Sequence, residues 1–213
     1  NSSDFAITVS NVNEAPIITS AESLSIVENL AAVLTLTSSD PESDSLTYAL
    51  SGDDAALFSV NAATASLSFK SAPDFETPGD TDGDNRYVVT VTATDVGGAS
   101  VSQDLTISVT DVNESPLITS AAALSAAENQ TAIGTVEVSD ADGDTLTLSV
   151  SGSELAVTAQ GALSFVSAPD YESKSTYTAT ITVSDGSNSV SQDITITVND
   201  LVEIEAETNI NIN

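Results

Sequence analysis

The chain repeats itself with an offset of about 100 residues, and this internal repeat limits its possible folds more than any other feature. The segment that begins at Asn11 with Asn-Val-Asn-Glu-Ala-Pro returns at Asp111 as Asp-Val-Asn-Glu-Ser-Pro. The acidic segment that begins at Ser38 returns at Val138 with the same offset. Two copies within 213 residues predict two domains of ordinary size rather than one large domain.

The repeat also sets the domain boundaries that we expect. Repeat two is the shorter copy, because it has Ser-Lys-Ser where repeat one has the longer segment 77–86. The first residues match the end of a repeat, so we expect the sequence to come from a longer tandem array. The expected parts are the last strand and linker of a preceding repeat (1–13), repeat one (14–113), repeat two (114–200), and a tail or the start of a next module (201–213).

Apolar and polar residues alternate with a period of two through most of each repeat. In one such segment Leu105, Ile107 and Val109 share a face, and no long stretch shows a sustained helical period. About seven such segments in each repeat predict an all-β fold of two tandem immunoglobulin-like, seven-stranded β-sandwiches. Aromatic residues are expected to fill the two cores rather than to form a carbohydrate-binding platform: Phe58, Phe69, Phe75, Tyr87, Phe165, Tyr171 and Tyr177.

The charge of the chain is strongly one-sided. It carries 32 Asp and Glu residues against three basic residues, a formal net charge of −29. Such a surface excludes an ordinary nucleic-acid binder, because neutralising phosphates requires Lys and Arg. Two carboxylates about 5 Å apart repel each other by roughly 3 kcal/mol at an effective dielectric constant near 20. A solvated acidic surface would explain scattered acids, whereas acids bunched at repeating positions indicate bound cations.

Several chemistries are excluded by composition. The absence of His and Cys removes zinc, haem and iron–sulfur ligation, and with them any catalytic set that needs His. Repeated acids in a modular array are better explained by calcium than by a glycosidase pair, and no phosphate-cradling Gly loop occurs. No run of about 18 apolar residues is present, so no membrane-embedded segment is expected. We do not expect an enzyme.

The segment that joins the repeats carries oxygen donors where a merely flexible linker would have Gly and Ser. Asp111, Asn113 and Glu114 lie within it, and Pro116 follows. Carboxylates and amides are the ligands that a hard cation such as Ca²⁺ prefers. We interpret the segment as a calcium-binding joint between two modules.

Acidic signatures recur in the same order in both repeats. They are a Glu-Asn pair after the first strand, an Asp-x-Asp or Asp-x-Glu pair after the second, an Asp-aromatic-Glu group, and an Asp that ends the sixth strand. With the linker, they resemble the PEN, DxD, DRE, xDx and DxNDN motifs of tandem cadherin repeats. The chain looks closer still to the cadherin-like repeats of large bacterial surface (RTX-type) adhesins. The resemblance covers both repeats and implies cadherin-like sandwiches in an extended rod at the extracellular cell surface.

The resemblance also implies which side chains hold calcium at each junction. The central joint would consist of Glu28, Asp74, Glu76, Asp111, Asn113, Glu114, Asp140, Asp142 and Asp185. The N-terminal partial joint would consist of Asn11, Asn13, Glu14, Asp40, Glu42 and Asp95. The C-terminal partial joint would consist of Glu128, Asp170, Glu172 and Asp200. The central set suffices for about two or three ions. The linker ends in Glu114 where the family motif has Asp-Asn, which weakens or removes one of them.

A separate candidate lies in the sequence Asp-Thr-Asp-Gly-Asp-Asn. Its carboxylates are those of Asp80, Asp82 and Asp84. The sequence looks like the start of an EF-hand loop but lacks the distal bidentate Glu. It is either a calcium loop or an acidic turn around Gly83.

We expect a calcium-rigidified extender or adhesion module of a bacterial cell-surface protein, with Ca²⁺ at the joint between repeats stiffening the array. The expected partners are calcium and the neighbouring repeats of the same chain. Two alternatives stay open. The repeats could be directly adhesive, through homophilic or glycan contacts, or they could be a linker in a secreted carbohydrate-active enzyme.

Overall fold

The computed structural model describes residue 8 and residues 10–202, which form two compact units. Unit 1 ends at Val112 and unit 2 begins at Asn113. Both are built from strands, and one short 3₁₀ turn, η1 (Ala55–Leu57), interrupts them in unit 1. The predicted all-β fold of two tandem sandwiches is confirmed. The expectations for residues 1–7, 9 and 203–213 lie outside the described part of the chain.

Unit 1 contains two main sheets and a short ribbon. The larger sheet has the order β2-β9-β8-β5, formed by Ser23–Val27, Ser100–Thr110, Arg86–Thr94 and Thr47–Ser51. The smaller sheet has the order β3-β7-β6, formed by Ala32–Thr35, Ser66–Phe69 and Phe58–Asn61. The ribbon pairs β1 (Ile17–Ile18) with β4 (Ser38–Ser39). Strand β2 runs parallel to β9, whereas the other pairs are antiparallel. The four- and three-stranded sheets supply the predicted seven strands.

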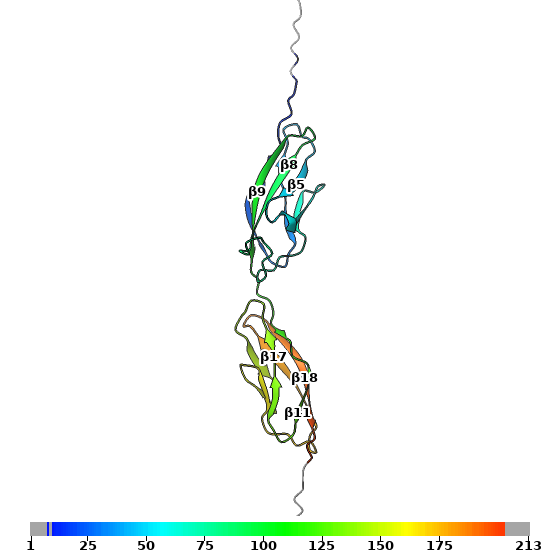
Figure 1. Cartoon of the computed structure of the whole chain (residues 1–213), viewed down its shortest axis with the longest axis vertical. Coiled ribbons are helices and arrows are strands. Elements are labelled where there is room, and N and C mark those ends of the chain that lie inside the picture. The colour runs from blue at the N-terminus through cyan, green and yellow to red at the C-terminus, as the bar shows by residue number, and fades with distance from the viewer. Residues whose placement is uncertain (1–7, 9, 203–213) are drawn as a thin grey trace, which may run out of the picture. The chain divides into compact units, whose positions relative to one another are not determined.

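Unit 2 repeats this topology. Its larger sheet has the order β11-β18-β17-β14, formed by Ala123–Ala127, Ser189–Asn199, Thr176–Ser184 and Thr147–Val150. Its smaller sheet has the order β12-β16-β15, formed by Ala132–Thr135, Ala162–Phe165 and Leu155–Val157. The ribbon pairs β10 (Leu117–Ile118) with β13 (Val138–Ser139). Figure 1 shows the large sheet of each unit, with β5, β8 and β9 labelled in unit 1 and β11, β17 and β18 in unit 2.

The core of each unit follows from the period-two pattern, because alternate side chains of a strand point to the same face. In unit 1, Val89, Val91 and Ile107 are fully buried between the sheets. Phe69 packs against Phe58 with ring centroids 4.3 Å apart and meets Tyr87 edge to face at 4.9 Å. In unit 2, the corresponding core residues are Ile181, Val183, Ile196, Leu163 and Phe165.

One expected core residue does not belong to a core. Tyr171 is 38% exposed, although the equivalent Phe75 packs partly buried against the core of unit 1. The fold uses the main chain of Tyr171, whose N–H donates to the buried carboxylate of Glu128. The core prediction for this ring is therefore wrong. Among the described residues no helix has the length and apolar character needed to cross a membrane.

Candidate metal centres

A buried glutamate organises the end of unit 1 at which the chain leaves. Glu28 directly follows β2 and is only 2% exposed. Its Oε2 accepts a hydrogen bond from the N–H of Phe75 at 2.8 Å, and its Oε1 accepts one from the N–H of Val112 at 2.9 Å. Both hydrogen bonds offset the cost of burying the charge. Carboxylate oxygens of Glu28, Asp74 and Glu76 lie within 4.8 Å of one another, a group able to hold a cation.

The Glu-Asn signature has a local backbone reason. Asn29 has φ of 61°, in the left-handed region that Asn tolerates better than most residues. This turn lets the Asn29 N–H donate to Pro73 O at 2.9 Å, which places the Asp74 segment beside Glu28. Asn129 has the same φ and makes the same bond to Pro169. The Glu of the signature thus supplies the carboxylate, and the Asn supplies the turn.

Unit 2 has the equivalent group at its own C-terminal end. Glu128 is 1% exposed, and its carboxylate accepts hydrogen bonds from the N–H groups of Tyr171 and Leu201 at 2.9 and 2.7 Å. Carboxylate oxygens of Glu128, Asp170 and Glu172 lie within 4.8 Å of one another. This gathers three of the four residues predicted for the C-terminal partial joint.

Electrostatics in this group reflect crowded acids. A side-chain hydrogen bond from Ser173, helped by the main chain, lowers the pKa of Asp170 below its ordinary value. A main-chain hydrogen bond lowers the pKa of Glu172, but desolvation and the charges of Glu128 and Asp200 outweigh it and raise the pKa. Asp200, the fourth predicted residue, therefore acts electrostatically on the same group.

The opposite end of unit 1 holds the residues predicted for the N-terminal partial joint. Asn11 Nδ2 donates to Glu42 Oε1 at 3.1 Å, and the N–H of Glu14 donates to Glu42 Oε2 at 3.1 Å. Asn13 Nδ2 donates to Asp95 Oδ2 at 3.0 Å. The incoming chain is thus fixed onto two acids, Glu42 in the turn after β4 and Asp95 directly after β8.

Asp40 completes this end. Its Oδ1 accepts main-chain hydrogen bonds from Glu42 and Asp44 at 2.9 and 3.1 Å. Within the described part of the chain, its buried Oδ2 has no hydrogen-bond partner. A Cβ at Gly97 would lie 2.4 Å from Asn13 Oδ1, so a larger residue there would displace the side chain of Asn13. An oxygen that is closed to water and unpaired is a reason to look for a cation.

Unit 2 repeats the arrangement where its chain begins. Asn113 Nδ2 donates to Asp185 Oδ2 at 3.0 Å, and the N–H of Glu114 donates to Asp142 Oδ2 at 2.8 Å. A main-chain hydrogen bond from Asn188 and the Asn113 side chain lower the pKa of Asp185. Of the residues described, Asp140 Oδ2 and Asp142 Oδ1 are buried without hydrogen-bond partners.

One residue of this group was missed from the predicted ligands. Carboxylate oxygens of Asp140, Asp142 and Asp144 lie within 4.8 Å of one another. Asp144 could have been found from the sequence, because the Asp-Ala-Asp-Gly-Asp spacing places a third acid in the same turn. The predicted central set therefore forms two groups, one in each unit: Glu28, Asp74 and Glu76 in unit 1, and Asn113, Glu114, Asp140, Asp142 and Asp185 in unit 2. Asp111 follows β9 and is exposed.

A further acidic group lies on the segment that only repeat one possesses. Carboxylate oxygens of Asp80, Asp82 and Asp84 lie within 4.8 Å of one another. Burial raises the pKa of Asp80, but main-chain hydrogen bonds from Asp84 and Asn85 and the contact with Asp82 outweigh it and lower the pKa. The same contact, with the charge of Asp84, raises the pKa of Asp82. The two neighbouring carboxylates thus shift in opposite directions, Asp80 toward the charged form and Asp82 toward the protonated form.

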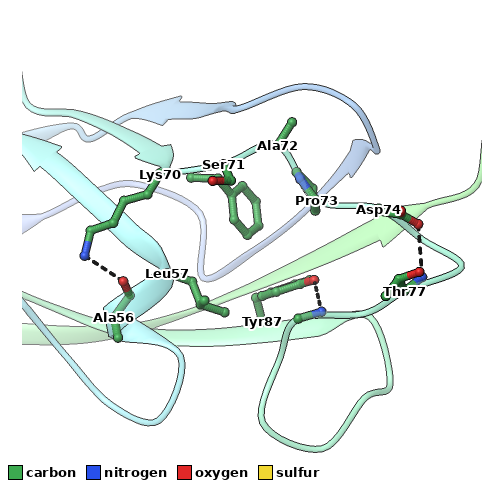
Figure 2. A pocket seen from close by; sticks show the side chains of 11 residues that line it. Ala56, Leu57, Lys70, Ser71, Ala72, Pro73, Asp74, Thr77 and Tyr87 are labelled. Atoms are coloured by element: carbon green, nitrogen blue, oxygen red, sulfur yellow. Dashed lines mark hydrogen bonds between the residues drawn. The ribbon is translucent and has the colours of Figure 1, made fainter.

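A largely apolar pocket of about 280 Å³ lies beside Asp74 in unit 1. Figure 2 shows Leu57 and Tyr87 within it, with the Tyr87 hydroxyl accepting a hydrogen bond from the N–H of Gly79 at 3.0 Å. In unit 2, Lys174 Nζ lies 4.3 Å from the centroid of the equivalent Tyr177 ring and forms an ion pair with Glu154. An equivalent pocket of about 390 Å³, lined by Tyr177 and Asp170, is present in unit 2, so the two repeats differ here in the lysine that contacts the tyrosine ring.

Comparison with known proteins supports the fold. The family model described as "Bacterial Ig domain" matches residues 13–108 and 113–199. No curated protein sequence matches the chain. Solved structures of cadherin repeats are similar, at identities that establish the fold alone.

Human protocadherin-24 EC1-2 is 21% identical over 89% of this chain and all of its own, with a TM-score of 0.61. Drosophila N-cadherin EC1-4 is 23% identical over 88% of this chain, with a TM-score of 0.60. This chain spans 50% of that N-cadherin fragment. Mouse cadherin-23 EC22-24 is 17% identical over 89% of this chain and 68% of its own, with a TM-score of 0.55.

Proposed function

The chain belongs to the bacterial Ig domain family, and on this basis we propose that it is a calcium-stiffened extender module of an extracellular adhesion protein. In this proposal Ca²⁺ binds the acidic groups at the ends of each unit and fixes the chain that passes between consecutive units. The role is mechanical: the module holds another part of a cell-surface protein at a distance. The cation also removes the repulsion between carboxylates that the sequence places together.

The observation that carries the proposal is the double attachment of Glu28. One carboxylate oxygen holds the segment that bears Asp74 and Glu76, and the other holds the N–H of Val112, the last residue of unit 1. An ion bound by this group would therefore restrain the exit of the chain. Glu128 supports the same inference for unit 2, through the N–H of Leu201.

The entry of the chain into unit 2 has a matching device. Asn113 is tied to Asp185, and the main chain of Glu114 is tied to Asp142. Val112 and Asn113 are consecutive residues, so the exit group of one unit and the entry group of the next are anchored on adjacent positions of the chain. Ca²⁺ takes six to eight oxygen ligands and tolerates irregular geometry, which suits donors drawn from several segments.

The expected energetic effect is large enough to measure. A ligand that binds only the ordered state stabilises it by about 2.7 kcal/mol per site at 100 times its dissociation constant. Without the cation, each pair of neighbouring carboxylates contributes repulsion instead. Calcium is therefore expected to convert a flexible connection into a stiff one.

Small-angle X-ray scattering and thermal unfolding of the whole chain, with Ca²⁺ and with a chelator, test the proposal. Calcium should narrow the distribution of intramolecular distances and raise the unfolding midpoint, and Mg²⁺ at the same concentration serves as the control for ionic strength. Scattering and midpoint that do not respond to calcium would overturn it. Calcium-dependent self-association, or binding to immobilised glycans, would instead favour the directly adhesive alternative.

A further inference from the structure

The segment 77–86, which distinguishes repeat one from repeat two, is fixed to unit 1 by a buried carboxylate. Asp54 is 5% exposed and accepts hydrogen bonds from the N–H and Oγ1 of Thr81, both at 2.9 Å, and from the N–H of Val88 at 2.7 Å. The Tyr87 hydroxyl accepts a further bond from the N–H of Gly79 at 3.0 Å. These hydrogen bonds give the insertion a defined conformation.

This fixed segment gathers its three aspartates. Asp80 is 8% exposed, and its Oδ2 accepts a hydrogen bond from the N–H of Asp84 at 2.8 Å. Carboxylate oxygens of Asp80, Asp82 and Asp84 lie within 4.8 Å of one another. None of the three belongs to the groups at the ends of the unit.

A second observation comes from Asn85, which is 9% exposed. Its N–H lies 3.3 Å from Asp80 Oδ1, which holds the residue against the acidic group, and its Nδ2 donates to Phe75 O at 2.8 Å. Its Oδ1 is shielded from solvent and has no hydrogen-bond partner among the described residues. A buried amide oxygen without a donor is rare in folded proteins, and a cation would supply the missing partner.

We propose that Asp80, Asp82, Asp84 and Asn85 form a divalent cation site internal to unit 1, suited to Ca²⁺. All the donors are side-chain oxygens, the ligands of a hard cation, and three of them carry charge. The ion would relieve the repulsion among the aspartates and satisfy Asn85 Oδ1. It would also hold the insertion that forms one wall of the pocket in Figure 2, where Thr77 and Gly79 belong to the lining. The site is independent of the proposed role at the chain junctions.

Calcium titration of the whole chain by isothermal calorimetry tests the site. The variant carries Asp82→Asn and Asp84→Asn, which are both exposed, and the matched control is Asp53→Asn, an exposed acid outside the group. The double variant should bind one Ca²⁺ fewer per chain than the wild type and the control. An unchanged ion stoichiometry would overturn the site.

Location is tested by two-dimensional NMR of the Gly83 amide during the same titration. In the wild type this signal should shift with calcium, and in the double variant the shift should be lost. If the Gly83 signal of the wild type does not shift when calcium is added, the proposed location of the site is wrong, whatever number of ions the calorimetry gives. A variant with Glu76→Gln and Asp142→Asn separates this site from the proposed junction sites. In this variant calcium should no longer change the scattering, while the Gly83 signal should still shift.

Discussion

Glu28 Oε1 accepts a hydrogen bond of 2.9 Å from the main-chain N–H of Val112, a residue 84 positions further along the chain. The bond links the start of unit 1 to the position where the chain leaves it. Because the other oxygen of Glu28 accepts a hydrogen bond from the N–H of Phe75, a single buried side chain connects the end of β2, the Asp74 segment and the exit. A change in the position of the Glu28 carboxylate would therefore be transmitted to the outgoing chain through this hydrogen bond.

Replacement of this glutamate should destabilise unit 1 even without calcium. Glu28→Ala leaves the part-buried N–H groups of Phe75 and Val112 without their side-chain acceptor, at about 1.5–3 kcal/mol for each lost hydrogen bond to the charged carboxylate. The unfolding midpoint of unit 1 should fall by about 4–8 °C per kcal/mol, measured by calorimetry with a chelator present. Glu22→Ala, an exposed glutamate, is the control, and an equal effect of both changes would contradict the assigned role.

Asp142→Asn should weaken calcium binding while leaving the fold of unit 2 intact. The change removes a carboxylate whose Oδ1 is buried and has no partner among the described residues, and retains an acceptor for the N–H of Glu114. We expect calcium affinity to drop about tenfold, which corresponds to 1.4 kcal/mol, in a calorimetric titration. Glu137→Gln, at an exposed position of the same unit, should bind calcium as the wild type does.

Substitutions at Asn29 separate backbone conformation from side-chain chemistry. Asn29→Ala places an alanine at φ of 61°, which costs roughly 1–2 kcal/mol, whereas Asn29→Gly avoids this strain. Urea unfolding should show the alanine variant less stable than the glycine variant. The reverse order would indicate that the side chain of Asn29 matters more than its turn.

High pH should selectively weaken unit 1 through Tyr87. Burial, with the charges of Asp80 and Asp54, raises the pKa of this phenol above its ordinary value of 10.0. A raised folded-state pKa stabilises the fold below pH 10, and this stability is lost as the pH rises from the unfolded pKa through the folded one. Tyrosinate absorbance should reveal a late step, from a group that titrates above the ordinary pKa of 10.0. Tyr87→Phe should remove that late step; its persistence would assign the step to another tyrosine.

Matched core truncations should act on one unit at a time. Leu67 and Leu163 occupy equivalent positions of β7 and β16 and are 1% and 2% exposed. Leu67→Ala and Leu163→Ala should each cost about 2–5 kcal/mol. Calorimetry should show a lowered transition for unit 1 in the first variant and for unit 2 in the second. A single transition that responds equally to both changes would show that the units unfold together.

Much of the fold was predictable because its signals are local and repeated. The alternation of Leu105, Ile107 and Val109 specifies a strand with one buried face, and the structure buries all three. The acidic groups were also anticipated by position, since Glu28, Asp74 and Glu76 do come together. The parallel pairing of β2 with β9 was not anticipated, because strand pairing depends on contacts between residues far apart in sequence.

The remaining differences have physical causes. The burial of Glu28 could not be read from its charge, because the hydrogen bonds that permit it come from the main chain of Phe75 and Val112. Nothing in the sequence distinguishes Asp54 from a surface acid, yet it is buried and its carboxylate accepts the hydrogen bonds from Thr81 and Val88 that hold the insertion. Tyr171 was expected in the core because its side chain is aromatic. In the structure it is the main-chain N–H of Tyr171 that makes the defining contact, a hydrogen bond to the carboxylate of Glu128.

The parallel pair of strands also determines how each unit responds to pulling. The chain enters unit 1 before β2 and leaves it after β9, and these strands are joined by register pairs from Ser23 with Thr106 to Val27 with Thr110. Tension between the two ends drags parallel neighbours in opposite directions, so it loads the whole ladder in shear rather than opening it one rung at a time. Strands β11 and β18 face the same load in unit 2. In each sandwich, the parallel pair of strands therefore resists tension that is applied along the chain.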